Sequence, residues 1–245
     1  MDHQFVRTEM LLGSQAMERL SRSHVAVFGL GGVGSWCAEA LCRSGVGELT
    51  LIDQDTVSES NLNRQAAALH STLGMEKAQA TALRLRDISP SCILHPVVAR
   101  YEAERRKEFF QESYDYIVDA IDLVSCKLDL IETAHRRGIP IISALGTGNK
   151  RDAQQLRITD LSKTEGCPLA RVVRKELRAR GIVHHQVVFS PEPACAAQAG
   201  DEPPPPGRRS IPASAMWVPA AAGLLLAQAV ILALSQGDTT PEPSR

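Results

Sequence analysis

Two cationic side chains follow a glycine-rich turn and together predict a binding site for a polyphosphate. The turn is Gly29-Leu30-Gly31-Gly32-Val33-Gly34, Arg64 lies in a later polar segment, and Lys77 begins the next helical stretch. Glycines permit a tight turn and a close approach of the backbone to phosphate, and the following helix offers oriented N–H groups. Arg64 and Lys77 would neutralise the remaining negative charge of a nucleoside triphosphate.

An acidic residue, Asp53, ends the second apolar run of this region, Leu49 to Ile52. At that place an aspartate binds the ribose hydroxyls of a nucleotide. A dinucleotide enzyme needs this aspartate but not the polar segment after it, so the pattern favours ATP over NAD. A NAD-binding redox protein and a non-catalytic nucleotide-binding module are the alternative interpretations. The predicted nucleotide-binding residues are Gly29, Gly31, Gly32, Gly34, Asp53, Asp55, Asn61, Asn63, Arg64, Gln65 and Lys77.

A third acidic position follows the buried strand predicted for Tyr116 to Ala120, where the chain reads Asp119-Ala120-Ile121-Asp122. Ligands of doubly wound sheets bind at the carboxyl ends of the strands, which places Asp122 beside the phosphates. Its carboxylate is suited to hold Mg²⁺ or to cap the helix predicted from Ser125 to Arg137. Asp119 is expected to support the site from behind.

Apolar runs alternate with helical patterns along the chain, which predicts an α/β fold. We expect a Rossmann-like doubly wound sheet, mostly parallel, with an antiparallel C-terminal extension and helices on both faces. Residues 1–236 form one domain in this interpretation, and residues 237–245 a disordered tail. Strands are predicted at 25–28, 49–52, 92–98, 116–120, 140–145, 155–159 and 183–189, and helices at 5–20, 34–43, 76–88, 104–112, 125–137, from 168, and at 213–234.

Positive charge gathers between Lys163 and His185, where six cationic side chains stand against two acidic ones. On a helix that begins near Pro168, four of them have the spacing of a single helix face. Such a face is suited to contact a nucleic-acid backbone, although a solvated helix surface produces the same pattern. The residues of this predicted nucleic-acid face are Arg171, Arg174, Lys175 and Arg178.

The composition narrows the class of protein. The chain has 245 residues and a formal net charge of −1, which excludes a globally basic nucleic-acid binder. Its six cysteines have irregular spacing and form no Cys-x-x-Cys pair, and no signal peptide precedes them, so a cytoplasmic location is expected. The apolar stretch from Ala213 to Leu234 is long enough to span a membrane, but Pro219 and Gln228 favour a buried closing helix.

Several motifs resemble the ThiF/MoeB/HesA superfamily, the adenylating enzymes related to ubiquitin-activating enzyme. They are GLGGVGS, LIDQDTVSESNLNRQ and GMEKAQA. Within it, VGSWCAEAL, NLNRQ, DYIVDAIDLVSCK and ITDLSKTEGCPLARVVRKELRARG are similar to the branch of tRNA threonylcarbamoyladenosine dehydratases. The similarity runs from about Phe5 to Leu234. Some superfamily members hold a structural zinc on two Cys-x-x-Cys pairs, which are absent from this sequence.

The resemblance implies a chemistry and a set of partners. The threonyl carboxylate of the modified tRNA attacks the α-phosphate of ATP, and the carbamoyl group then closes a ring on the acyl-adenylate. It implies Mg²⁺ on Asp122 and a homodimer in which Arg7 reaches the partner's ATP site, so that the catalytic residues are Arg7, Arg64, Lys77 and Asp122. A sulfur-relay protein is a further expected partner. Adenylation of a ubiquitin-like or sulfur-carrier protein is the alternative. Cys167 and Cys195 are the candidates if a catalytic cysteine exists.

Overall fold

The computed structural model describes residues 3–196 and 212–236 and contains a single seven-stranded sheet. Its order is β3-β2-β1-β4-β5-β7-β6, in which β6 is antiparallel to β7 and every other pairing is parallel. The predicted α/β doubly wound sheet with an antiparallel extension is therefore confirmed. The strands are β1 (His24–Phe28), β2 (Glu48–Ile52), β3 (Ile93–Val97), β4 (Tyr116–Asp119), β5 (Ile141–Ala144), β6 (Arg157–Asp160) and β7 (Gln186–Phe189).

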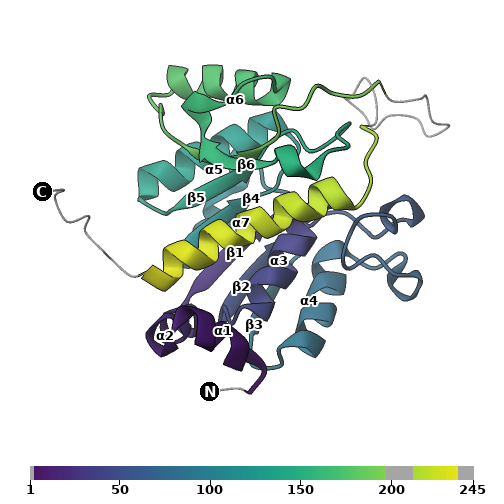
Figure 1. Ribbon diagram of the computed structural model, residues 1–245, viewed down its shortest axis with the longest axis vertical. Helices are drawn as coiled ribbons and strands as arrows, with labels where there is room; N and C mark the ends of the chain where they lie inside the picture. The colour runs from purple at the N-terminus through teal and green to yellow at the C-terminus, as the bar shows by residue number, and fades with distance from the viewer. Residues whose placement is uncertain (1–2, 197–211, 237–245) are drawn as a thin grey trace, which may run out of the picture.

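Helices cover both faces of the sheet because alternate residues of each strand point to opposite sides. Val25 and Val27 of β1 pack with α2, α3, α4 and α7, whereas Ala26 and Phe28 pack with η4, α5 and α6. Figure 1 shows α7 and α3 lying side by side across one face. The helices are α1 (Val6–Leu12), α2 (Ser14–Arg22), α3 (Gly34–Arg43), α4 (Lys77–Ile88), α5 (Val124–Arg137), α6 (Pro168–Ala179) and α7 (Trp217–Gln236), with short 3-10 segments such as η2 (Glu59–Asn61), η4 (Ala103–Phe110) and η6 (Leu161–Lys163).

Helix α7 is the one helix of the described residues that is long and apolar enough to cross a membrane. It packs against α2, α3 and β5, and Val218, Leu226 and Val230 are buried in the core. Gly223 permits the close approach, because a Cβ there would lie 2.4 Å from the Val33 carbonyl oxygen. These contacts agree with the closing-helix interpretation.

Three predicted elements differ most from the structure, one in its type and two in where they begin. The segment predicted as an α-helix at 104–112 is the 3-10 helix η4, whose tighter turn places Phe109 and Phe110 against Phe28. Strand β7 begins at Gln186 rather than Val183, and the Leu161 N–H still donates to the His185 carbonyl at the end of its pairing with β6. Helix α7 starts at Trp217, not at residue 213.

The predicted tail at 237–245 lies outside the described residues, as do residues 197–211.

Candidate active site

The turn after β1 accepts only glycine at two positions. Gly29 has φ +89°, and a Cβ on it would lie 2.7 Å from the Ala120 carbonyl oxygen. A Cβ on Gly34 would lie 1.8 Å from the Gly29 carbonyl oxygen, whereas one on Gly31 would meet no atom within 4 Å. The turn is thus packed against β4 on one side and open at Gly31, which is the arrangement that a bound phosphate requires.

The first turn of α3 lies directly behind this opening. Its N-cap residue, Val33, provides no side-chain cap, so the N-terminal end of the helix is suited to receive an anion. The Ser35 hydroxyl donates to the Gly31 carbonyl at 2.7 Å and accepts from the Ala66 N–H at 3.0 Å. This hydroxyl therefore ties the glycine turn to the polar loop that carries Arg64.

Asp53 and Lys77 place charged side chains beside the glycine turn. Asp53 Oδ2 accepts from the Leu30 N–H at 2.7 Å, and its Oδ1 accepts from the Asp55 N–H at 2.8 Å. Lys77 Nζ donates to Asp55 Oδ2 at 3.0 Å although its side chain is only 10% exposed. Burial raises the pKa of Asp53, while the charge of Lys77 opposes that rise. Three residues from two parts of the chain therefore converge beside the turn.

Arg64 lies over the same turn. A Cβ on Gly32 would be 3.3 Å from Arg64 Cγ, and the Arg64 carbonyl accepts from the Trp36 indole at 2.9 Å. Its guanidinium donates to the Ser60 carbonyl at 2.7 Å and to Asn63 Oδ1 at 2.8 Å. The arginine is thus held in the polar loop, at the place predicted for a phosphate contact.

The other predicted loop residues shape the loop from within. Asn63 Nδ2 donates to the Ser214 carbonyl at 3.0 Å, and Asn61 Oδ1 accepts from the Ser58 N–H at 3.2 Å. Asn61 and Gln65 are buried, each 8% exposed. Their role as nucleotide contacts stays a prediction.

A buried ion pair supports the site from behind. Lys127 Nζ donates to Asp119 Oδ2 at 2.5 Å and to the Ala144 carbonyl at 3.2 Å, and both side chains are 0% exposed. Asp119 Oδ1 also accepts from the Ile121 N–H at 3.0 Å, which fixes the chain leaving β4. Sequence reasoning assigned Asp119 this supporting position but missed Lys127. The sequence feature that could have identified Lys127 is its place as a lysine among mostly apolar, buried residues of α5.

Asp122 lies just past the end of β4, exposed at the same edge of the sheet. Helix α5 starts at Val124 rather than Ser125 and its N-cap residue is Leu123, so Asp122 lies one residue before the N-cap position, and its capping role stays a prediction. An exposed carboxylate at this edge has the oxygen chemistry of a Mg²⁺ ligand.

Arg7 lies at the opposite edge of the sheet. Phe5, next to α1, approaches Gly45 after the C-terminal end of α3, and Gln4 donates to Ser89 after the C-terminal end of α4. The ten residues of α3 separate this edge from the glycine turn by about 15 Å. Arg7 is exposed there and does not join the other site residues within its own chain.

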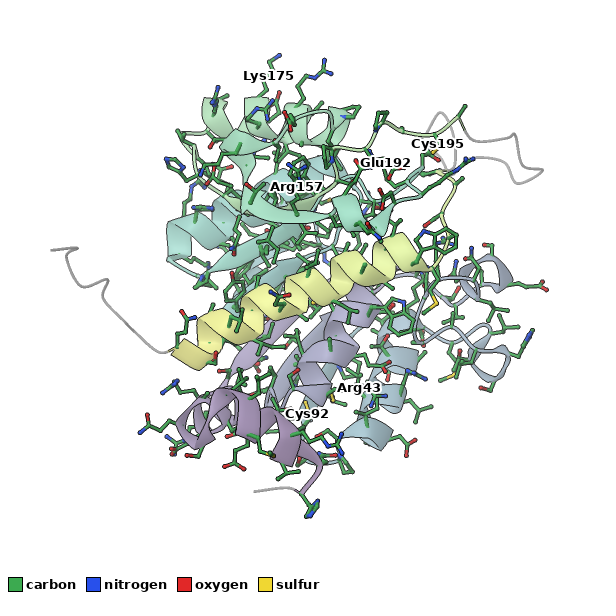
Figure 2. The ribbon with its side chains drawn as sticks, in the orientation of Figure 1. Arg43, Cys92, Arg157, Lys175, Glu192 and Cys195 are labelled. Carbon is green, nitrogen blue, oxygen red and sulfur yellow. The ribbon has the colours of Figure 1, made fainter. Side chains whose placement is uncertain are left out.

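The predicted basic face of α6 contains three exposed members, Arg171, Lys175 and Arg178. Figure 2 shows Lys175 projecting from α6 away from the body of the molecule. Arg174 differs, since its Nη1 donates to the Thr164 carbonyl at 2.7 Å and to the Thr164 hydroxyl at 2.6 Å. That guanidinium is partly used to hold the segment before α6.

Cys167 has a structural position. It is buried at the N-cap of α6, where its Sγ accepts from the Ala170 N–H at 3.5 Å. A Cβ on Gly146, which follows β5, would lie 2.6 Å from this sulfur. Cys195 is half-exposed and carries a free thiol. Helix α6 therefore starts beside the carboxyl end of β5, at the same edge as the glycine turn.

Known proteins are similar to this chain in sequence and in fold. The ThiF family profile matches residues 5–244. The tRNA threonylcarbamoyladenosine dehydratase of Bacillus subtilis is 40% identical over 240 residues, which cover 95% of this chain and 94% of that protein. The protein of the same name from Escherichia coli is 40% identical over 175 residues, 71% of this chain and 65% of that protein.

A solved structure agrees over nearly the whole length. The crystal structure of Escherichia coli TcdA in complex with ATP matches with a TM-score of 0.87 and 33% sequence identity, covering 98% of this chain and 96% of that chain. The resemblance inferred from the motifs is thereby confirmed.

Proposed function

The chain belongs to the ThiF family, and on that premise we propose that it is an ATP-dependent tRNA threonylcarbamoyladenosine dehydratase. One observation carries the proposal: a turn that only glycine fits faces Lys77, Asp53 and Arg64 at the carboxyl edge of the sheet. The B. subtilis relative that matches almost end to end bears this name, and the E. coli relative binds ATP in its crystal structure.

Each residue of the site has a separate role in adenylation. Gly31 leaves room for the phosphates beside the first turn of α3, and Asp53 lies where the ribose hydroxyls bind. Lys77 and Arg64 stabilise negative charge as the substrate carboxylate attacks the α-phosphate and pyrophosphate leaves. The carbamoyl group then closes the ring, releasing AMP, so no cysteine nucleophile is needed.

Two further contributions belong to this proposal. Asp122 would hold Mg²⁺, which supplies positive charge at the phosphates when bound. Arg7 lies about the length of α3 from its own site, so it would act in the site of a second copy of the chain, within a homodimer.

Five of the six cysteines are buried free thiols, which supports a cytoplasmic location. A sulfur-relay partner stays a prediction.

The test uses ATP, Mg²⁺ and tRNA that carries threonylcarbamoyladenosine. We expect AMP and the cyclised nucleoside to form in equal amounts, with no AMP from tRNA that lacks the modification. Lys77→Met should lower the rate by about 10²–10³-fold, the loss typical of one transition-state charge contact. If the wild-type chain forms no AMP with the modified tRNA, the proposed function is wrong.

The tRNA would bind along α6. Its exposed cations lie on a helix that begins beside the carboxyl edge, so one tRNA can contact the helix and present its modified nucleoside to the site. Replacing Arg171, Lys175 and Arg178 together by Gln should make the salt dependence of tRNA binding less steep. The magnitude of the slope of log affinity against log salt concentration should fall by about one for each lost phosphate contact. Arg22→Gln, an exposed arginine of α2, is the control. An unchanged slope in the triple variant would exclude this face.

A further inference from the structure

A second group of polar side chains lies at the amino edge of the sheet, away from the candidate active site. His24, Glu48, His95 and Glu112 each offer one potential ligand atom, and these four atoms all lie within 4.8 Å of one another. His24 is buried, Glu48 and His95 are half-buried, and Glu112 is exposed. The group therefore has a closed inner side and an open outer side.

The register of the parallel strands builds this group. His24 of β1 pairs with Glu48 of β2, and Thr50 of β2 pairs with His95 of β3. Paired residues of neighbouring strands point to the same face, so the two imidazoles and the carboxylate meet on one side of the sheet. Glu112 comes from the segment between η4 and β4 and completes the group from outside.

The distances show two imidazole nitrogens directed at one carboxylate. His95 Nε2 lies 2.7 Å from Glu48 Oε1, and His24 Nδ1 lies 3.7 Å from the same oxygen. The other nitrogen of His24, Nε2, lies 2.8 Å from the Thr50 hydroxyl. A histidine that binds a metal through one nitrogen usually has the other held by a hydrogen bond of this kind.

We propose that His24, Glu48, His95 and Glu112 bind a divalent transition-metal ion of the Zn²⁺ class. Two imidazoles and two carboxylates are a ligand set suited to Zn²⁺ in tetrahedral geometry. Ligand atoms around such an ion are about 3.4 Å apart, given bonds of about 2.1 Å. The exposed Glu112 side chain has the freedom to close the remaining gap. This site is separate from the cysteine zinc sites of some relatives, since it uses no sulfur.

The competing account is an ion-pair cluster around Glu48 with no metal. When its Nε2 donates to Thr50, a neutral His24 directs the lone pair of Nδ1 at the Glu48 carboxylate. A cation between the two atoms satisfies both. In the other tautomer Nδ1 donates to Glu48 and Nε2 accepts from the Thr50 hydroxyl without a metal, so metal binding itself separates the two accounts.

Cobalt is the probe that reports both binding and geometry. A chelator first removes any bound metal from the full chain. The chain is then titrated with Co²⁺ while the visible d–d absorption bands of tetrahedral Co²⁺ are followed. Zn²⁺ is added last, as a competitor for the same site. We expect one Co²⁺ per chain, displaced by Zn²⁺. His95→Gln and Glu48→Gln should each weaken Co²⁺ binding more than tenfold, whereas the exposed His70→Gln should not change it.

A second variant tests the proposed support of His24. Thr50→Val keeps the side-chain shape but removes the hydroxyl beside His24 Nε2, and we expect Co²⁺ binding about 10–100-fold weaker. Far-UV circular dichroism identifies any variant that fails to fold, and Glu112→Gln, at an exposed position, then replaces that variant in the titration. Absence of stoichiometric Co²⁺ binding, or equal binding by wild type, His95→Gln and Glu48→Gln, would overturn the proposal. The readout does not depend on tRNA modification.

Discussion

The two edges of the sheet gather polar groups in different ways. At the carboxyl edge, backbone N–H groups, Lys77 and Arg64 surround an opening beside Gly31, and these groups come from the turn after β1, the polar loop after β2 and the start of α4. At the amino edge, His24, Glu48 and His95 come from the strands themselves and meet only through the sheet register. The first arrangement suits an extended anion, and the second suits a compact cation.

The difference has a physical cause. At the carboxyl edge the loops are free to carry charged side chains, and the glycine turn and the helix N-terminus add partial positive charge. At the amino edge the His24 group consists of side chains from three neighbouring strands and from the segment before β4, so its character comes from those side chains. Changes to single side chains should therefore affect the two edges differently.

The largest expected effect is at the buried ion pair behind the carboxyl edge. Lys127→Met would leave Asp119 buried without its cation, so the free energy of unfolding should fall by about 3–5 kcal/mol. The exposed pair of Arg22 with Glu18 is the matched control, and Arg22→Met should cost less than about 1 kcal/mol. Urea unfolding measures both, and equal losses would show that the buried pair is not a principal support.

Two glycines of the same turn should separate stability from binding. Gly29→Ala places a Cβ against Ala120 at a positive φ, so we expect a loss of about 2–3 kcal/mol in the free energy of unfolding. Gly31→Ala meets no neighbouring atom, so stability should hold while ATP binding weakens. Thermal unfolding measures the stability of both variants, and ATP titration measures their affinity for ATP. If Gly31→Ala binds ATP as the wild type does, Gly31 does not face the phosphates.

A smaller effect is expected at a buried histidine on the amino side of β7. Burial, with His135 and Lys127 nearby, lowers the pKa of His185 to about 3, although Asp160 opposes that fall. The folded state keeps His185 neutral while the unfolded chain takes up a proton below its ordinary pKa of about 6.5. Its contribution to stability is therefore complete above pH 6.5 and is lost progressively as the pH falls toward 3.

Urea unfolding at pH 7.5 and pH 5.5 tests this titration. Wild type should lose about 1.4 kcal/mol more than His185→Gln, a variant that can keep the hydrogen bond to Ser143. The neighbouring His184, whose side chain is 81% exposed, provides the control His184→Gln, which should behave as wild type. The same pH dependence in His185→Gln would show that another group is responsible.

The contrast between the edges also explains what the sequence predicted. Gly29 to Gly34, Asp53, Arg64 and Lys77 belong to one continuous stretch of the sequence, 29–77, with recognisable motifs, and the structure brings them together as expected. The mostly parallel sheet followed from the alternation of apolar runs and helical patterns. These features depend on neighbours in the chain, so they are visible without a structure.

The features that sequence reasoning missed depend on tertiary contacts. Lys127 meets Asp119 only because α5 packs behind β4, and Arg174 turns to Thr164 only because the chain folds back before α6. The histidine and glutamate group at the amino edge needs the register of three strands. The 3-10 form of η4 depends on two phenylalanines reaching Phe28. No local pattern carries that information.

The central claim is that the carboxyl edge binds a triphosphate through Lys77. Isothermal titration of the full chain with ATP and with NAD tests it, using Lys77→Met and the exposed Lys107→Met as its matched control. We predict that ATP binds more tightly than NAD, that Lys77→Met weakens ATP binding at least about tenfold, the loss of one charge-assisted contact, and that Lys107→Met leaves it unchanged. Tighter binding of NAD, or equal ATP binding by the two lysine variants, would contradict the account.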